Sequence, residues 1–235
     1  MRRRRMVPTL FRLALVLMAL SAADAGAATI KLSDYWFSKG VGDVWTYGYT
    51  QPTGVSDFTV AITLVNAGVY TGKYRIGDYR DPDGTTYYQI VSYDNNFLYL
   101  YYDSKHNTTF NPPAQIPITQ ELETTVPNPS NPNTGRWYFK KLDKFTVPAG
   151  TFSNILLKID LDTTFGPNAA NSIFGLPPSI PYGVTHAQWY AWRVGQIHDM
   201  DFDSTGVQGP TYVLKSTNAK PWGKAGAGLS LLLME

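Results

Sequence analysis

Apolar and polar side chains alternate at every second position along much of this chain, which is the period of a β-strand rather than of a helix. Phe58, Val60, Ile62 and Leu64 share one face of such a run, while Thr59, Ala61 and Thr63 share the other. The alternation recurs at Ile155, Leu157, Ile159 and Leu161. After residue 28, no segment keeps a 3.6-residue apolar period over three turns. The pattern predicts an all-β fold.

Composition agrees with this prediction. The 235 residues include 16 Tyr, 11 Phe and six Trp, whereas Glu occurs only three times. Aromatic side chains favour strands, and Glu favours helices. All-β sandwiches and barrels reach this length without splitting, so one domain can hold the whole core.

Short turns link the predicted strands of the first half. We expect strands at residues 44–49, 58–64, 69–76, 87–93 and 97–102. Residues 81–84 read Asp-Pro-Asp-Gly, in which Pro presets φ and Gly accepts a positive φ, as a tight turn requires. Consecutive strands joined by short loops pair antiparallel, so the first half is predicted to be an antiparallel meander.

Two proline-rich stretches interrupt the second half. Residues 111–135 hold six prolines, and Pro lacks the N–H that a central strand donates, so we expect a long crossover with one edge strand near residues 119–126. A linker between two domains is the alternative. Residues 166–183 form a second insertion rich in Pro and Gly. Strands are expected at residues 137–141, 144–147, 155–161, 186–192, 197–202 and 211–216, and residues 229–234 form either a last strand or a tail.

The first 28 residues have the pattern of a signal peptide. Arg2 to Arg5 and Arg12 precede and flank an apolar run at residues 13–20, and small residues follow. This run is too short to span a bilayer, although an uncleaved anchor is the competing interpretation. We therefore expect cleavage between Ala25 and Thr29, leaving residues 29–235 as a single secreted β-domain.

Charge and cysteine content exclude several classes of function. The formal charge is +2, but residues 1–28 carry five Arg and one Asp, so the rest of the chain is net negative. A nucleic-acid partner is therefore not expected, because duplex binding needs a clustered basic face. The absence of Cys excludes a disulfide framework, a thiolate nucleophile and an acylated lipoprotein cysteine. We expect an exported protein, periplasmic or extracellular, that is not lipid-anchored.

Three motifs together resemble a known class. They are Gly42-Asp43-Val44-Trp45-Thr46-Tyr47, then Val147-Pro148-Ala149-Gly150-Thr151-Phe152, then Trp189-Tyr190-Ala191 with Val194-Gly195. In this order the chain resembles a class of exported bacterial β-proteins and lipoproteins of unknown function. The resemblance implies an antiparallel meander forming a curved sheet or incomplete barrel, akin to the half-barrels of lipoprotein carriers.

The residues suited to catalysis or metal binding form no recognised motif. Asp199, Asp201 and Asp203 share one face of a predicted strand, and an edge strand with a solvated acidic face is the favoured interpretation over a calcium site. His186 and His198 could meet across two strands and bind a metal with Asp199, but ordinary histidines are favoured. No Gly-x-Ser-x-Gly sequence or distinguished carboxylate pair is present. We therefore expect no catalytic residue, no metal and no cofactor.

Residues 172–182 are apolar and contain four prolines or glycines, so we expect them to loop over the sheet as a plug or as a contact surface. The predicted ligand-binding residues are Phe174, Leu176, Ile180, Tyr182, Trp189 and Trp192. The favoured function is non-catalytic binding of an apolar, lipid-like molecule or of an envelope protein. A carbohydrate-binding module that uses exposed Trp and Tyr is the alternative, and an envelope hydrolase is the third.

Overall fold

The computed structural model describes residues 28–35, 41–51, 54–66, 68–80, 86–104, 107–129 and 131–219. The elements are β1 (Thr29–Lys31), η1 (Leu32–Asp34), β2 (Val44–Gln51), β3 (Gly54–Leu64), β4 (Tyr74–Arg80), β5 (Thr86–Tyr93), β6 (Phe97–Asp103), β7 (Thr108–Pro117), β8 (Thr119–Glu121), β9 (Thr125–Pro127), β10 (Gly135–Val147), β11 (Gly150–Asp162), α2 (Ala169–Ile173), β12 (Gly183–Ala191), β13 (Gly195–Phe202) and β14 (Gln208–Thr217). Strands dominate, as the alternation of side chains predicted.

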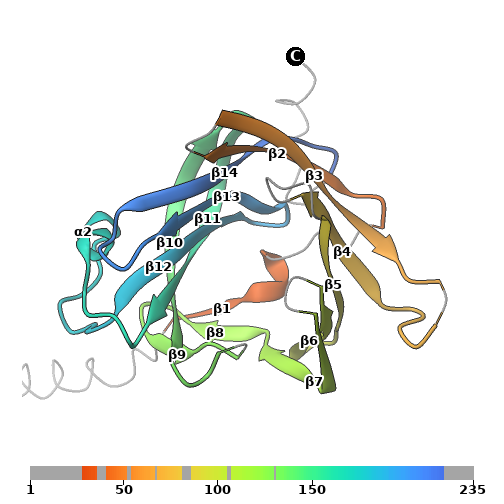
Figure 1. Cartoon of the computed structure of the whole chain (residues 1–235), viewed down its shortest axis with the longest axis horizontal. Helices are drawn as coiled ribbons and strands as arrows, with labels where there is room; N and C mark the ends of the chain where they lie inside the picture. Colours follow the sequence, from red (N-terminus) through yellow and green to blue (C-terminus); the bar gives the residue numbers. More distant parts are fainter. Residues whose placement is uncertain are drawn as a thin grey trace, which may run out of the picture.

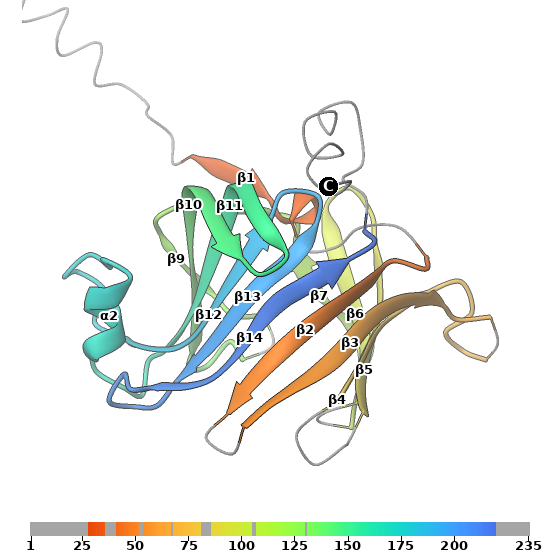
Figure 2. The same cartoon turned by 90° about the horizontal axis from the view of Figure 1, so that it is seen from above.

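Twelve of the strands form one antiparallel sheet in the order β7-β6-β5-β4-β3-β2-β14-β13-β12-β11-β10-β9. The sheet consists of two meanders, one from each half of the chain, joined where β14 pairs with β2. It curves around an interior without closing, because the edge strands β7 and β9 do not pair (Figures 1 and 2). The prediction of an antiparallel meander forming a curved sheet or incomplete barrel is confirmed.

The junction between the meanders is an extended strand pair. Tyr212 lies opposite Tyr49 in the register, and their rings stack with centroids 4.5 Å apart. Phe58 on β3 packs edge-on against Tyr212 at 5.1 Å. Aromatic pairs of this kind stabilise a sheet beyond the area that they bury. The two halves of the chain are thus fastened through side chains as well as through backbone hydrogen bonds.

The open side of the sheet is covered by the first described residues. β1 pairs antiparallel with β8 in a separate two-stranded sheet, and the Leu32 N–H donates to the Ile118 carbonyl at 2.7 Å. Ile30 and Leu32 are buried in a cluster with residues from both ends of the large sheet: Leu98, Leu100, Ile116, Trp137 and Phe139. The segment from β1 to η1 therefore bridges the two edges that do not pair (Figure 1).

A second layer covers the outer face of the C-terminal meander. The predicted insertion at residues 166–183 contains the short helix α2, whose first turn is closed by reciprocal hydrogen bonds between Asn168 and Asn171. The tip of the β10–β11 hairpin also folds back, and the Ala149 N–H donates to the Leu214 carbonyl at 3.1 Å. These segments bury an apolar cluster on the outer face of β11 to β14.

Several element predictions differ from the structure. The edge strand expected near residues 119–126 is two short strands, β8 and β9, and only β9 belongs to the large sheet. Residues 137–141 and 144–147 belong to one strand, β10, which runs unbroken to Val147. Residues 69–72 form a turn, so the strand expected at 69–76 begins only at Tyr74.

Part of the predicted crossover is strand β7, which tolerates its prolines because it is the edge of the sheet. β1 was not predicted. Residues 1–27 of the predicted signal peptide (1–28), the predicted turn at residues 81–84 and the predicted tail at 229–234 lie outside the described residues.

Within the described ranges, no helix is long and apolar enough to cross a bilayer.

Candidate functional site within the curved sheet

The inner face of the sheet carries a row of charged and amide side chains on three neighbouring strands. Antiparallel register places Asp160 of β11 opposite His186 of β12, and His186 opposite Asp201 of β13. Two residues away on each strand, and thus on the same face, Lys158 lies opposite Gln188, and Gln188 lies opposite Asp199. Side chains at directly paired positions point to the same face, so these six groups are neighbours.

This row forms one wall of a cavity of about 750 Å³. The opposite wall comes from the N-terminal meander and is apolar except for the amide of Gln89. Its apolar residues are Phe58, Val60, Ile62, Ile76, Val91, Leu98, Leu100 and Ile116. The aromatic residues Trp45, Tyr47, Trp137, Tyr190 and Tyr212 also line it. Cavities that hold small ligands in proteins have volumes of roughly 300–1,000 Å³, so the space is sufficient for one such molecule.

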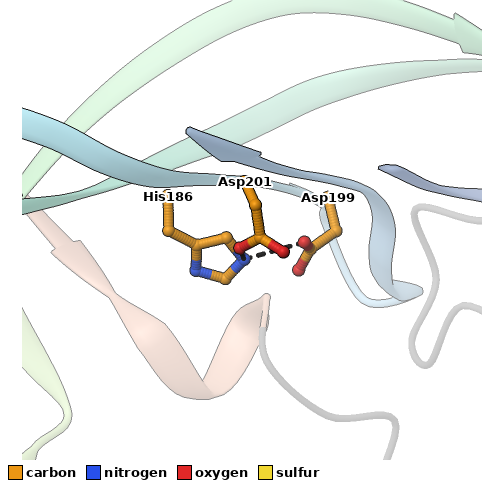
Figure 3. A group of neighbouring side chains, drawn as sticks. All are labelled: His186, Asp199 and Asp201. Atoms are coloured by element: carbon orange, nitrogen blue, oxygen red, sulfur yellow. Dashed lines mark hydrogen bonds and ion pairs between the residues drawn. The ribbon is translucent and has the colours of Figure 1, made fainter. Parts of the chain in front are cut away.

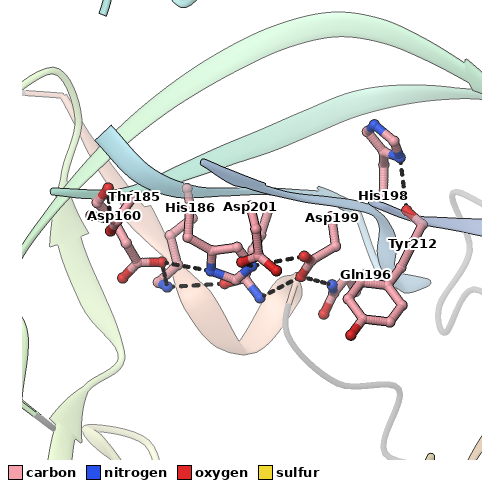
Figure 4. A network of polar contacts seen from close by, with 10 residues as sticks. Asp160, Thr185, His186, Gln196, His198, Asp199, Asp201 and Tyr212 are labelled. Atoms are coloured by element: carbon pink, nitrogen blue, oxygen red, sulfur yellow. Dashed lines mark hydrogen bonds and ion pairs between the residues drawn. The ribbon is translucent and has the colours of Figure 1, made fainter. Parts of the chain in front are cut away.

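The polar wall is tied together by short hydrogen bonds (Figure 4). Lys158 Nζ lies 2.6 Å from Asp160 Oδ2 and donates to Gln188 Oε1 at 2.9 Å. His186 joins two carboxylates, with Nδ1 3.2 Å from Asp160 Oδ2 and Nε2 2.7 Å from Asp199 Oδ1.

The second oxygen of Asp199 accepts from the amides of Gln188 at 3.1 Å and of Gln196 at 2.6 Å. Asp199 thus has three donors, which compensates for the burial of a charged group.

The network sets the protonation states of His186 and Asp160. Burial disfavours the charged form of His186, but the carboxylates of Asp199 and Asp160 outweigh it and raise its pKa from 6.5 to about 10. Burial likewise opposes ionisation of Asp160, yet Lys158 and His186 lower its pKa to about 2. At neutral pH His186 is therefore an imidazolium beside the ionised carboxylate of Asp160.

Tyr47 and Tyr190 stay neutral beside this row. Burial raises the pKa of both hydroxyls, and the negative charge of Asp199 raises it further. The Tyr47 hydroxyl donates to the Gln196 carbonyl at 2.8 Å. The aromatic part of the wall therefore adds no charge to the cavity.

His186, Asp199 and Asp201 are close enough to hold a metal ion, with candidate ligand atoms within 4.8 Å of one another (Figure 3). Imidazole binds a metal only through a deprotonated nitrogen. With the pKa of His186 raised to about 10, a proton occupies Nε2 at neutral pH and bonds to Asp199. A metal ion bound by these three residues would therefore have to displace that proton.

The alternative in which His186 and His198 meet across two strands is wrong. His198 lies opposite Trp189 in the register, one position off the inner-face pairs, and its ring stacks near Phe145 on the outer face with centroids 5.5 Å apart. Its Nδ1 lies 2.8 Å from the Tyr212 carbonyl oxygen (Figure 4). A shift of one residue moves a side chain to the other face of a sheet, and that shift separates the two histidines.

The interpretation of β13 as an edge strand with a solvated acidic face is also wrong. β13 lies between β12 and β14, and Asp199 is only 4% exposed. Asp203 belongs to the turn after β13, where its carboxylate accepts from the N–H groups of Thr205 and Val207. The shared face of Asp199 and Asp201 was correctly predicted, but it faces the cavity.

The six residues predicted to bind a ligand lie away from the cavity lining. Phe174, Ile180 and Trp189 are buried in the cluster on the outer face, with Leu176 and Tyr182 packed against it. Trp192 packs instead against the cluster around β1. The Phe174 ring contacts Trp189 at 5.9 Å and Phe202 at 5.5 Å. In the structure these side chains join the insertion to the sheet, and their role in binding a ligand remains a prediction.

Sequence reasoning missed the polar row as a site. Each member occupies an inner-face position of a strand whose other face is apolar, and such strands ordinarily have one solvated face. The available signal was the mixture of signs: Lys158 and Asp160 on one strand, His186 on the next and Asp199 on the third. Only the register shows that these charges pair with one another.

Neither a family model nor a curated protein matches this chain. Among solved structures it is similar to a candidate lipoprotein from Parabacteroides distasonis, with a TM-score of 0.43 and 15% sequence identity over 79% of this chain and 99% of that one. It is also similar to a candidate exported protein with a YmcC-like fold from Bacteroides fragilis, with a TM-score of 0.44 and 11% identity over the same shares.

Proposed function

We propose that this chain is an exported, non-catalytic binding protein that holds one amphiphilic small molecule inside its curved sheet. The observation that carries the proposal is the division of the cavity into an apolar wall from β3 to β7 and a polar wall from β11 to β13. A molecule with an apolar body and a polar end would satisfy both walls at once. Export is proposed from the leader at residues 1–28.

The apolar wall supplies the driving force for binding. Ile62, Val91 and Leu100 are each 5% exposed or less, so their neighbours already shield them from bulk water. An alkyl or ring system placed against this wall would lose its own contact with water, which contributes roughly 25 cal/mol for each Å² of apolar surface buried. The polar wall then orients the ligand, because its end must reach hydrogen-bonding partners.

The polar row is arranged for binding rather than for acid–base catalysis. A general base needs a pKa near the operating pH, whereas that of His186 is raised to about 10. Both ring nitrogens of His186 also lie within hydrogen-bonding distance of carboxylates. Each N–H of the imidazolium can therefore donate to one carboxylate, Asp160 or Asp199. These features support a binding protein over a hydrolase.

The Trp residues offer little support for the sugar-binding alternative. Trp45, Trp137 and Trp189 are 4–5% exposed, and Trp192 is half-buried. A flat platform for a sugar ring would need exposed indole faces, and among the described Trp residues the most exposed is the half-buried Trp192.

A pair of matched variants tests the proposal. Val60 lies on the cavity face of β3, and Thr59 lies beside it on the exposed outer face. Isothermal titration of the processed protein with monolauroylglycerol, below its micelle concentration, should show one saturable site. Val60→Trp should fill the cavity and weaken binding by about tenfold or more, a loss of about 1.4 kcal/mol, while Thr59→Trp should leave it unchanged.

The proposal fails if the unsubstituted protein binds no amphiphile of this kind. It fails equally if Thr59→Trp weakens binding as much as Val60→Trp does. Circular dichroism of both variants shows whether the sheet is retained, so a folding defect is distinguished from a filled cavity.

A further inference from the structure

We infer, on the basis of the proposed function, that the segment from β1 to η1 is a lid on the cavity, and that the ligand enters and leaves when β1 separates from β8. The lid would control access to the same site that the proposed function assigns. The surface on which the segment packs, the hydrogen bonds at its two ends and the place of β8 in the fold each support this role.

The segment packs on side chains that also line the cavity. Ile30 and Leu32 are buried in one apolar cluster with Val91, Leu98, Leu100, Ile116, Trp137 and Tyr190. All six of these partners belong to the cavity lining as well. Figure 1 shows β1 and η1 on the concave side of the sheet, across from the strands β11 to β13 that carry the polar row. Displacement of the segment would therefore open the cavity at its apolar wall.

The N-terminal end of the segment is held through β8. β1 pairs with β8 over three residues, whereas β2 pairs with β3 over eight. β1 and β8 form a separate two-stranded sheet, so their separation breaks no strand pairing of the large sheet. Two strands alone are marginally stable, and the burial of Ile30 and Leu32 is needed to hold β1 in place. Short elements with few hydrogen bonds are the ones that open locally while the rest of a protein stays folded.

The C-terminal end of the segment is anchored to the C-terminal meander. The N–H of Arg193, in the turn between β12 and β13, donates to the Asp34 carbonyl at 2.6 Å. The Tyr35 hydroxyl donates to Asn154 Oδ1 on β11 at 2.8 Å. The predicted cleavage site directly precedes β1, so in the processed protein β1 would lie at a free end of the chain. The N-terminal end is therefore the one that opens, with η1 as the fixed point.

A disulfide that links β1 to β8 tests the inference, because the chain has no Cys of its own. Lys31 lies opposite Thr119, and both are exposed. The next pair is hydrogen-bonded, since the Leu32 N–H donates to the Ile118 carbonyl. Lys31 and Thr119 are thus a non-hydrogen-bonded pair, whose Cα atoms lie roughly 4.5 Å apart, within the range of a disulfide. Lys31→Cys with Thr119→Cys should lock the lid without altering a buried residue.

Stopped-flow tryptophan fluorescence of the processed protein follows the binding of monolauroylglycerol, since Trp45 and Trp137 line the cavity. Oxidation of the double variant should slow association and dissociation by about tenfold or more, and dithiothreitol should restore both rates. The matched control links Thr146 to Thr151, exposed residues of the β10–β11 hairpin whose side-chain oxygens lie 2.9 Å apart. Thr146→Cys with Thr151→Cys should bind at the same rate in both redox states.

The outcomes distinguish the lid from the proposed function. Equal rates for the oxidised and reduced double variant, or equal slowing by the control disulfide, would overturn the inference and leave the proposed function intact. Failure of the two introduced cysteines to link would show that β1 does not pair with β8, and would overturn the inference as well. If neither the unsubstituted protein nor the reduced variant binds monolauroylglycerol, the proposed function falls and the inference falls with it.

Discussion

His186 is the residue on which the polar row depends, because it connects Asp160 to Asp199. Replacing a buried ion-pair network by apolar residues of similar volume is often neutral or stabilising. Apolar residues at these inner-face positions could therefore have given a sheet of the same stability. A ligand that the cavity binds explains these charges better than stability does, and this supports the proposed function.

The raised pKa of His186 predicts a pH dependence of stability. The folded protein holds this proton up to about pH 10, whereas the unfolded chain releases it near 6.5. The stabilisation is therefore complete below pH 6.5 and is lost as the pH rises toward 10, by at most about 1.4 kcal/mol for each pH unit. Urea unfolding between pH 7 and 9 should show this decline, and His186→Gln should flatten it.

His198 provides the control for that experiment. Burial lowers its pKa, so it destabilises the protein only as the pH falls below the ordinary value of 6.5. His198→Gln should change the pH dependence below 6.5 and leave the slope between pH 7 and 9 intact. An equal flattening by both substitutions would show that the slope does not arise from His186.

At the scale of elements, the short segment from β1 to η1 covers the gap between the two unpaired edges of the sheet. Leu32 is 1% exposed and packs in the cluster that includes Leu98 and Phe139. Its backbone is held by the Ile118 carbonyl. We call this segment, residues 29–34, and its contacts with the two edges the seam. The stability of the seam should therefore depend on a few apolar contacts.

Leu32→Ala tests the seam. Removing a fully buried Leu side chain costs about 2–5 kcal/mol, so the free energy of unfolding should fall by an amount in this range. Lys31→Ala is the neighbouring control, because Lys31 is exposed and its removal should change stability by less than about 0.5 kcal/mol. Urea titration of both variants measures the difference, and equal effects would mean that the segment does not seal the core.

The sequence predicted elements better than it predicted the site. β3 alternates cleanly, and β5 and β6 are rich in the aromatic and aliphatic residues that strands favour, so local rules were sufficient for them. β1 has only three residues, and its strand character comes from pairing with β8, which no local rule contains. The polar row required the register of three strands, and β7 required knowledge that it lies at an edge. These are properties of the assembled sheet rather than of any segment.

At the scale of the whole molecule, the pairing of β14 with β2 makes one sheet from two meanders that are distant in sequence. The cavity exists only when both are present, because one supplies its apolar wall and the other its polar wall. We therefore expect the chain to unfold in one cooperative transition. Tryptophan fluorescence and far-ultraviolet circular dichroism should give the same urea midpoint, whereas two separated midpoints would favour two domains joined by a linker.

The pairing of β2 with β14 also determines when the sheet can be completed during biosynthesis. β2 leaves the ribosome early, but its partner β14 comprises residues 208–217, near the end of the chain. Until then one side of β2 presents unpaired backbone groups, and the apolar wall has nothing opposite it. Such edges and surfaces promote association with other chains. The large sheet therefore cannot be completed until residues 208–217 have been synthesised.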